Sequence, residues 1–252
     1  MRYLIENIPK NINMNYKILI WGAKSKALIL INMLRNNEFF DKKKKIIARK
    51  VKYLVDPFLK EPEFETKIPF INKKKEFLNN INNTNSFIVG IGGHFGKART
   101  LISKELIKRG LRPINAIHKS SIIDKTSFLG DGTQIMPNAV VHCHSQIGDF
   151  TILNTSSVIE HECEIGIGTH IMAGACVAGK VKIGNYVTIG TNATIFPNVK
   201  ISDGAFIGAG SVIRKNVKEN EVIAGNPGRF LRKNSHYYNL DFFKSSKNQK
   251  IR

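Results

Sequence analysis

The residues best suited to chemistry lie near the middle of the chain, where a histidine directly precedes a glutamate at His161-Glu162. Histidine can take a proton from a nucleophile near neutral pH, and a neighbouring carboxylate favours the protonated ring. Three more histidines, His142, His144 and His170, occur in the same region. This concentration of histidines indicates either general-base catalysis or a metal site. Which of the two applies depends on how the secondary structure positions these residues.

The region around these histidines has a strict period of six residues. From Ile123 to Lys218, 96 residues divide into 16 hexads without an insertion. Every hexad begins with Ile, Leu or Val and carries Ser, Thr, Ala, Cys or Val at its fifth place. A coil with three short strands in each 18-residue turn has this period, because the aliphatic residue fills the axis and the small one fits beside a corner. We therefore predict a parallel coil of a little over five turns.

The 18-residue turn predicts which side chains stack on one another. One column contains Lys125, Cys143, His161, Gly179 and Pro197. Adjacent turns of such a coil lie about 4.8 Å apart. His161 is thus expected at a corner, one turn from Gly179 and with Glu162 beside it.

Two other chemistries are weighed against general-base catalysis. A zinc site needs three imidazoles that converge on one ion. One turn beyond His142 lies Glu160, and one turn beyond His144 lies Glu162, so no column supplies the second and third histidine. Cys143 stacks one turn before His161, which permits a covalent relay; a small residue that fills a corner is the simpler interpretation.

Ahead of the coil, apolar segments alternate with helical patterns. Strands are expected over residues 16–22, 51–56 and 86–92, and helices over residues 25–36 and 98–110. Alternation of strand and helix predicts a small parallel α/β sheet.

Composition and charge exclude several classes of protein. The chain has 252 residues, with 39 Lys+Arg against 19 Asp+Glu and 3 Cys, too few for a disulfide scaffold. The charge is uneven: +15 over residues 1–116, +1 over 117–218 and +4 over 219–252. The run from Lys42 to Lys45 lacks the interleaved aromatics of a nucleic-acid site, so no nucleic acid is expected. No apolar run approaches the length of a transmembrane helix, and we expect a soluble, cytoplasmic protein.

The hexads, together with the ending from Val222 to Arg229, resemble the hexapeptide-repeat acyltransferases. With an α/β domain in front, the chain looks like the sugar acetyltransferases of the PglD/NeuD type (the sialic acid O-acetyltransferase NeuD family). The resemblance covers roughly residues 15–233 and is strongest over 154–162 and 165–179. It implies a Rossmann-like α/β domain (15–116) followed by a left-handed parallel β-helix (117–233), with an N-terminal extension (1–14) and a basic C-terminal tail (234–252).

For activity, the resemblance implies an acetyl-CoA-dependent N-acetyltransferase that acts on a nucleotide-linked amino sugar of the UDP-4-amino-sugar type. It also implies a homotrimer and no metal. One alternative is O-acetylation of a sialic-acid-type sugar. Another, from a different class, is a coil without catalytic activity that binds a partner or acts as a scaffold; loss of His161 would be its sign, and His161 is present.

The resemblance also assigns roles to individual residues. His161 is the general base, Glu162 raises its basicity, and the amide of Gly179 faces the acetyl oxygen. Further acetyl-CoA contacts are expected at His170, which should face outward at another corner, and at Thr191 and Ala209.

The substrate contacts implied by the resemblance lie mainly in the α/β domain. Lys24, Ser25 and Lys26 stand where the family has Ser-Gly-His, so a phosphate would be held there by lysine charge and a helix N-terminus, without the close backbone approach that glycine allows. Asp56 matches the acidic position that contacts the nucleoside. The remaining expected substrate contacts are Gly92, Gly93 and Asn154.

Overall fold

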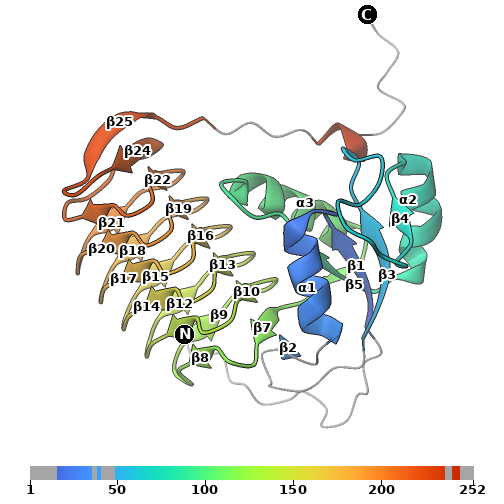
Figure 1. The fold of residues 1–252 in the computed structure, drawn as a ribbon, viewed down its shortest axis with the longest axis horizontal. Helices are drawn as coiled ribbons and strands as arrows, with labels where there is room; N and C mark the ends of the chain where they lie inside the picture. The colour runs from blue at the N-terminus through green and yellow to red at the C-terminus, as the bar shows by residue number, and fades with distance from the viewer. Residues whose placement is uncertain (1–15, 36–38, 41–48, 236–239, 245–252) are drawn as a thin grey trace, which may run out of the picture.

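The structure is a computed structural model that describes residues 16–35, 39–40, 49–235 and 240–244. It consists of an α/β domain packed beside a long parallel β-helix (Figure 1). The expected N-terminal extension, residues 1–14, the lysine run at residues 42–45 and most of the expected tail lie outside the described residues. Within the described ranges, no helix is long and apolar enough to cross a membrane.

The α/β domain contains a five-stranded parallel sheet in the order β4-β3-β1-β5-β6. Its strands are β1 (Tyr16–Trp21), β3 (Arg49–Val55), β4 (Phe70–Ile71), β5 (Ser86–Val89) and β6 (Arg112–Pro113). Its helices are α1 (Ser25–Arg35), α2 (Lys74–Asn80), the 3-10 helix η1 (Ile81–Asn83) and α3 (Gly96–Lys108). The predicted parallel α/β sheet is confirmed, and it includes β4, α2 and β6, which the sequence pattern did not indicate.

Alternate residues of β1 point to opposite faces of this sheet, as the pleat of a strand requires. Ile18 and Ile20 join the cluster that contains the buried face of α1. Leu19 and Trp21 join the cluster that contains Phe77 of α2 and the buried face of α3. One helix therefore covers one face of the sheet, and two cover the other.

The hexads form three parallel sheets that coil into a triangular prism (Figure 1). Strands one turn apart pair with an offset of 18 residues, as in Val158↔Cys176 and Glu164↔Lys182. The first residue of each hexad points into the axis, where Ile135, Ile147 and Ile159 are fully buried. The predicted coil and its register are confirmed.

Each sheet is named here for its outer surface. The domain-facing sheet contains β2 (Phe39–Phe40), β7 (Ala116–His118), β10 (Gln134–Ile135), β13 (Ile152–Leu153), β16 (His170–Ile171), β19 (Thr188–Ile189), β22 (Phe206–Ile207), β24 (Glu221–Ala224) and β25 (Arg229–Lys233). The apolar sheet contains β8 (Ile122–Ile123), β11 (Val140–Val141), β14 (Val158–Ile159), β17 (Cys176–Val177), β20 (Thr194–Ile195) and β23 (Val212–Ile213). The charged sheet contains β9 (Phe128–Leu129), β12 (Gln146–Ile147), β15 (Glu164–Ile165), β18 (Lys182–Ile183) and β21 (Lys200–Ile201).

The three outer surfaces have different surroundings. The α/β domain covers the domain-facing sheet, so that Ile152, His170 and Thr188 are buried although they point away from the prism axis. The charged sheet exposes Glu164 and Lys182 to solvent. The outward residues of the apolar sheet are almost all small or aliphatic: Ile122, Val140, Val158, Cys176, Thr194 and Val212.

A short C-terminal segment, residues 240–244 with the 3-10 helix η2 (Asp241–Phe243), packs on the α/β domain. The ring of Phe243 stacks on Trp21 at 4.8 Å between centroids, and the guanidinium of Arg109 lies over the same Phe243 ring, 4.9 Å from its centroid. Phe242 meets Trp21 and Phe77 edge-on. This part of the expected basic tail, residues 240–244, is called the aromatic hook below. Its two phenylalanine rings cover the face of the sheet between α2 and α3.

Candidate active site

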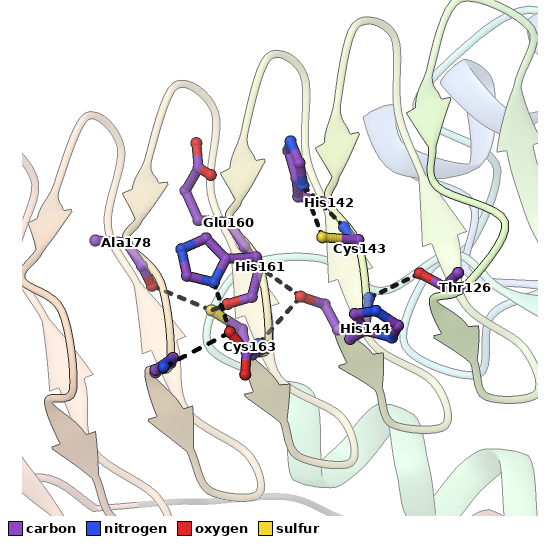
Figure 2. Close-up of polar contacts among 11 residues, drawn as sticks. Thr126, His142, Cys143, His144, Glu160, His161, Cys163 and Ala178 are labelled. Atoms are coloured by element: carbon purple, nitrogen blue, oxygen red, sulfur yellow. Dashed lines mark hydrogen bonds and ion pairs between the residues drawn. The ribbon is translucent and has the colours of Figure 1, made fainter.

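The corner between the apolar and charged sheets carries the residues predicted to be catalytic. His161 and Glu162 lie in the turn between β14 and β15. Figure 2 shows His161 on its turn between the turns that carry Cys143 and Ala178. The corner is open, because the side chains of His161 and Glu162 are 46% and 49% exposed. A substrate approaching from solvent can therefore reach both.

The two side chains form a hydrogen bond that sets the orientation of the imidazole. His161 Nδ1 donates to Glu162 Oε2 over 2.9 Å. This bond, together with the nearby charge of Lys180, whose Nζ lies 3.8 Å from the same oxygen, holds the pKa of Glu162 below its usual value. With Nδ1 engaged as donor, the lone pair of a neutral His161 lies on Nε2, which is the atom able to accept a proton.

Gly179 allows the imidazole to lie flat over the next turn of the coil. A Cβ atom at Gly179 would lie 2.5 Å from His161 Nε2 and 2.6 Å from Cε1. Any other residue would therefore displace the ring. Among the described residues, none accepts a hydrogen bond from the Gly179 N–H. The corner thus presents a proton acceptor and a free amide donor side by side, the pair that acyl transfer requires.

Several neighbours of His161 make local hydrogen bonds (Figure 2). His142 Nδ1 accepts a hydrogen bond from the backbone N–H of Cys143 over 2.9 Å, and the backbone N–H of His144 donates to Thr126 Oγ1. Cys163 is buried, its thiol faces the Ala178 carbonyl at 3.1 Å, and burial raises the pKa of this thiol to about 11. In the part of the chain that the structure describes, no group of three metal-ligating side chains converges.

His170 lies in a different environment from the one expected. It points away from the prism axis, but it is only 4% exposed, since the α/β domain covers β16. Its Nδ1 lies 2.9 Å from the Gly93 carbonyl oxygen. Burial, reinforced by the charges of Arg99 and Lys26, lowers the pKa of His170 to about 3. The expected outward-facing corner position is wrong, because the hexad pattern carries no information about which sheet another domain covers.

Three other predicted residues lie at the corner between the domain-facing and apolar sheets. Asn154 follows β13, Thr191 follows β19 and Ala209 follows β22. Asn154 accepts a hydrogen bond from the Thr155 N–H within its own turn. Within one chain, these three residues lie at the opposite edge of the apolar sheet from His161.

In the first loop of the α/β domain, after β1, both lysines contact other residues of the same chain. Lys24 is exposed and forms an ion pair with Glu63. Lys26 Nζ lies 3.2 Å from the sulfur of Met136, and burial and the charge of Arg99 lower the pKa of Lys26 to about 7. Ser25 is exposed at the start of α1.

Asp56 and the two glycines lie at the same carboxyl edge of the sheet. Asp56 is 8% exposed and accepts hydrogen bonds from the Ala23 and Phe58 N–H groups over 3.2 and 3.1 Å. Its carboxylate therefore helps to hold the first loop. Gly92 has open space where a side chain would be, and Gly93 has a φ of +60°.

Arg99 joins the two parts of the molecule, and the sequence pattern did not single it out. It is 1% exposed and donates to the carbonyl oxygens of Phe150, Gly168 and Ile91 over 2.7, 2.8 and 2.9 Å. Burial lowers the pKa of Arg99 to about 9. The one sign of this role in the sequence was an arginine on the buried face of the helix over residues 98–110. The sequence could not identify its partners in the β-helix, because Phe150 and Gly168 are far away along the chain.

Comparison with known proteins supports the fold. The family model for the bacterial transferase hexapeptide (six repeats) matches residues 162–197. No curated protein sequence matches the chain. PerB from Caulobacter crescentus, solved with CoA and GDP-perosamine, is 23% identical with a TM-score of 0.72, over 86% of this chain and 97% of PerB.

Two other solved structures are similar over almost their entire length. The acetyltransferase domain of PglB from Neisseria gonorrhoeae is 23% identical with a TM-score of 0.73, over 86% of this chain and 100% of that domain. WeeI from Acinetobacter baumannii is 22% identical with a TM-score of 0.72, over 85% and 99%. The expected fold class, a Rossmann-like α/β domain followed by a left-handed parallel β-helix, is thus confirmed: the chain has the fold shared by PerB, the PglB acetyltransferase domain and WeeI.

Proposed function

We propose that this chain is an acetyl-CoA-dependent N-acetyltransferase that acts on the amino group of a nucleotide-linked amino sugar, with His161 as general base. The observation that carries the proposal is the exposed His161–Glu162 pair seated over Gly179, with Nε2 of His161 beside a free amide donor. The solved structures support the substrate class, since PerB was solved with CoA and GDP-perosamine.

His161, Glu162 and Gly179 each have a separate role in acyl transfer. Acetyl-CoA supplies the acetyl group as a thioester. His161 Nε2 takes the proton of the attacking amine as the new N–C bond forms, and returns it to the sulfur as the C–S bond breaks. Glu162 holds the ring in the tautomer that this step needs. The Gly179 N–H donates to the carbonyl oxygen as negative charge develops on it.

The acceptor must reach His161 from outside its own chain. In a triangular prism, the corner between two sheets lies opposite the third sheet, and the α/β domain contacts that third sheet through Gln134, His170 and Met136. A sugar held by the loops of the α/β domain is therefore separated from His161 of the same chain by the β-helix. We infer a homotrimer in which one chain provides the base and its neighbour provides the substrate loops.

The apolar sheet is the surface best suited to the contact between chains. Its outward residues are small or aliphatic, and Ile122 is 66% exposed, whereas three of the five outward residues of the charged sheet are charged: Glu164, Lys182 and Lys200. Burying such a surface is favourable by roughly 25 cal/mol per Å². The apolar sheet also lies between the His161 corner and the corner with Asn154, Thr191 and Ala209, so packing across it would bring the two corners of different chains together.

The nucleotide site belongs to the same proposal. Within a division into an α/β domain (15–116) and a β-helix (117–233), we assign the nucleotide-linked sugar to the loops that contain Lys24 to Lys26, Asp56 and Gly92-Gly93, as the family resemblance implies. A bound phosphate would favour the protonated form of Lys26, whose pKa burial and the charge of Arg99 lower to about 7, whereas Lys24 is paired with Glu63. We assign acetyl-CoA to the corner that carries Thr191 and Ala209, as the family resemblance implies.

An acetylation assay tests the function. The purified chain is incubated with acetyl-CoA and a panel of UDP-, GDP-, CMP- and dTDP-linked sugars, and free thiol is measured together with the mass of the sugar product. One amino sugar should gain an acetyl group, whereas the matching sugar with a hydroxyl in place of the amine should not. Cys143→Ala should remain active, because direct transfer needs no covalent relay. Acetylation of the hydroxyl sugar alone would contradict N-transfer.

Complementation tests the shared site. His161→Ala and Lys26→Ala chains are coexpressed, so that mixed oligomers contain an intact base from one chain and intact loops from its neighbour. Mixed oligomers should regain activity well above the sum of the two variants made separately. Activity equal to that sum, or a monomeric mass in solution, would contradict a site formed between chains.

A further inference from the structure

Arg99, on the buried face of α3, joins the α/β domain to one corner of the β-helix. Its Nε donates to the Phe150 carbonyl over 2.7 Å, and its Nη2 donates to the Gly168 carbonyl over 2.8 Å. Phe150 lies between β12 and β13, and Gly168 lies between β15 and β16. The two carbonyls therefore belong to successive turns of the corner between the charged and domain-facing sheets, and one guanidinium spans both.

The same side chain also binds its own domain. Its Nη1 donates over 2.9 Å to the carbonyl of Ile91, at the start of the loop that connects β5 to α3. A guanidinium presents its donors in a rigid planar fork. Three carbonyls that bind one fork are held at fixed positions relative to one another. The loop, α3 and the β-helix are thus joined at one point.

The charge of Arg99 is balanced by carbonyl dipoles alone. The side chain is 1% exposed, and among the described residues no carboxylate pairs with it. Burial lowers its pKa to about 9, so the guanidinium remains charged at neutral pH. A buried cation without an acid is costly, and an apolar side chain of similar volume is often at least as stabilising. The property that only an arginine supplies at this position is therefore the geometry of its donors.

Gly96, the first residue of α3, permits the close approach between the helix and the β-helix. A Cβ atom on Gly96 would overlap the Gly168 carbonyl oxygen, the same oxygen that Arg99 binds. Any side chain at residue 96 would therefore push α3 away from the β-helix, although the guanidinium itself would be unchanged. The sequence thus offers two separate ways to release one contact.

The orientation of the α/β domain matters for the proposed reaction. The loops to which the sugar is assigned belong to the α/β domain, whereas His161 of the neighbouring chain belongs to a β-helix. A misplacement of about 1 Å between reacting groups can lower a rate by about 10²-fold, even when its cause lies far from the chemistry. A residue that fixes the α/β domain on the β-helix therefore controls the alignment of the amine with the base.

We propose that Arg99 is a positioning residue for acetyl transfer: by binding the carbonyls of Ile91, Phe150 and Gly168 at once, it fixes the orientation of the α/β domain on the β-helix, and with it the place where the bound sugar meets the base. Arg99 acts through the backbone and needs no contact with either substrate. The kinetic part of this inference rests on the proposed function, whereas its structural part, the fixed domain, does not.

Two substitutions in the full-length chain release this contact in different ways. Arg99→Met keeps an apolar side chain of similar length and removes every donor, and Gly96→Ala separates α3 from the β-helix but keeps the guanidinium. Each should lower kcat for the best amino sugar of the panel by about 10²-fold. In the double variant the two losses should not add, because both substitutions release the same contact. Lys104→Met, on the exposed side of α3, is the matched control and should behave as the wild type.

Calorimetry with the free nucleotide of that sugar (UDP, GDP, CMP or dTDP) separates misplacement from loss of the substrate site. In Arg99→Met, the Kd of the nucleotide should change by less than about threefold, and the number of sites per chain should stay at the wild-type value. A kcat within about twofold of the wild type in Arg99→Met would overturn the proposal. A fall in kcat accompanied by an equal loss of nucleotide sites would also overturn it, because it would show a merely structural role.

Amide hydrogen exchange gives a measurement that needs no activity. Exchange over residues 91–99 should be faster in Arg99→Met and Gly96→Ala than in Lys104→Met, while the β-helix remains protected in all three. Equal exchange in the three variants would overturn the fixed domain, even in a chain that acetylates the panel. A wild type that acetylates no sugar, but whose variants show this exchange pattern, would contradict the proposed function and leave the contact made by Arg99 supported.

Discussion

His161 and His170 lie nine residues apart on the same β-helix, yet their surroundings differ in every respect that matters for chemistry. His161 is 46% exposed at an open corner, beside a carboxylate. His170 is 4% exposed beneath the α/β domain, near two cations and a backbone carbonyl. The first can exchange a proton with a substrate, whereas the second remains neutral and holds a loop. Residue type alone therefore does not identify a catalytic histidine in a coil of this kind.

A substitution at the contact between His161 and Gly179 should have the largest effect, and it tests whether exposed His161 is the catalytic histidine of the two. Gly179→Val should lower kcat by about 10²–10³-fold, because the added side chain displaces the imidazole from its seat. Far-ultraviolet circular dichroism should remain that of the wild type. In a His161→Ala background, the same substitution should have little further effect, since the ring it displaces is gone. Additive losses in the double variant would show that Gly179 acts independently of His161.

The buried histidine should be visible in the pH dependence of stability. The pKa of His170 is about 3 in the folded chain, below the ordinary value of 6.5. Between these values the unfolded chain binds a proton that the folded chain does not, so this contribution to stability is complete above pH 6.5 and is lost as pH falls. From pH 7 to pH 4.5 the loss is about 3 kcal/mol. His170→Asn should remove about that much of the decrease, measured by urea unfolding at both pH values; an identical decrease in both chains would contradict the buried neutral ring.

Glu162 should have a smaller effect than the base that it orients. Glu162→Gln keeps the shape of the side chain but removes its charge, and kcat should fall about tenfold. The hydrogen bond from His161 keeps the pKa of Glu162 below its usual value, so the carboxylate is already ionised above pH 5. Because the ionised carboxylate favours the protonated form of His161, Glu162→Gln should also move the acidic limb of the rate profile to lower pH. An acidic limb at the same pH in both chains would show that Glu162 does not affect the basicity of His161.

A substitution in the aromatic hook should have the smallest effect of the four, and that effect should be confined to the α/β domain. Phe243→Ala removes the ring stacked on Trp21, which is the only tryptophan of the chain. We expect a loss of about 1 kcal/mol in unfolding free energy and a shift of the Trp21 fluorescence to longer wavelength, because water then reaches the indole. Phe58→Ala, at a side chain that is 70% exposed, is the control and should leave the emission unchanged. An unshifted emission in Phe243→Ala would show that the hook does not shield Trp21.

The β-helix could be predicted from the sequence in detail, because each place in the hexad repeats one environment. The first place fills the axis, and the fourth place adopts a positive φ at the corner, as at His144, Glu162 and Lys180. The stacking of His161 on Gly179 follows from counting 18 residues. The main strands of the α/β sheet could be predicted because they are continuous apolar runs.

The features that could not be predicted depend on contacts between segments distant in sequence. Arg99 donates to carbonyl oxygens that belong to the β-helix, and no local pattern marks those carbonyls. Phe243 lies in a basic segment, yet it packs on Trp21 more than two hundred residues earlier. The burial of His170 likewise depends on which sheet the α/β domain covers.

The turnover of His161→Ala, measured with saturating acetyl-CoA and the best sugar of the panel, tests the central claim most directly. If His161 takes the proton of the attacking amine, kcat should fall by about 10²–10⁴-fold. Binding of acetyl-CoA, measured by calorimetry, should barely change, because the imidazole acts on the nucleophile. Turnover near that of the wild type would contradict the account.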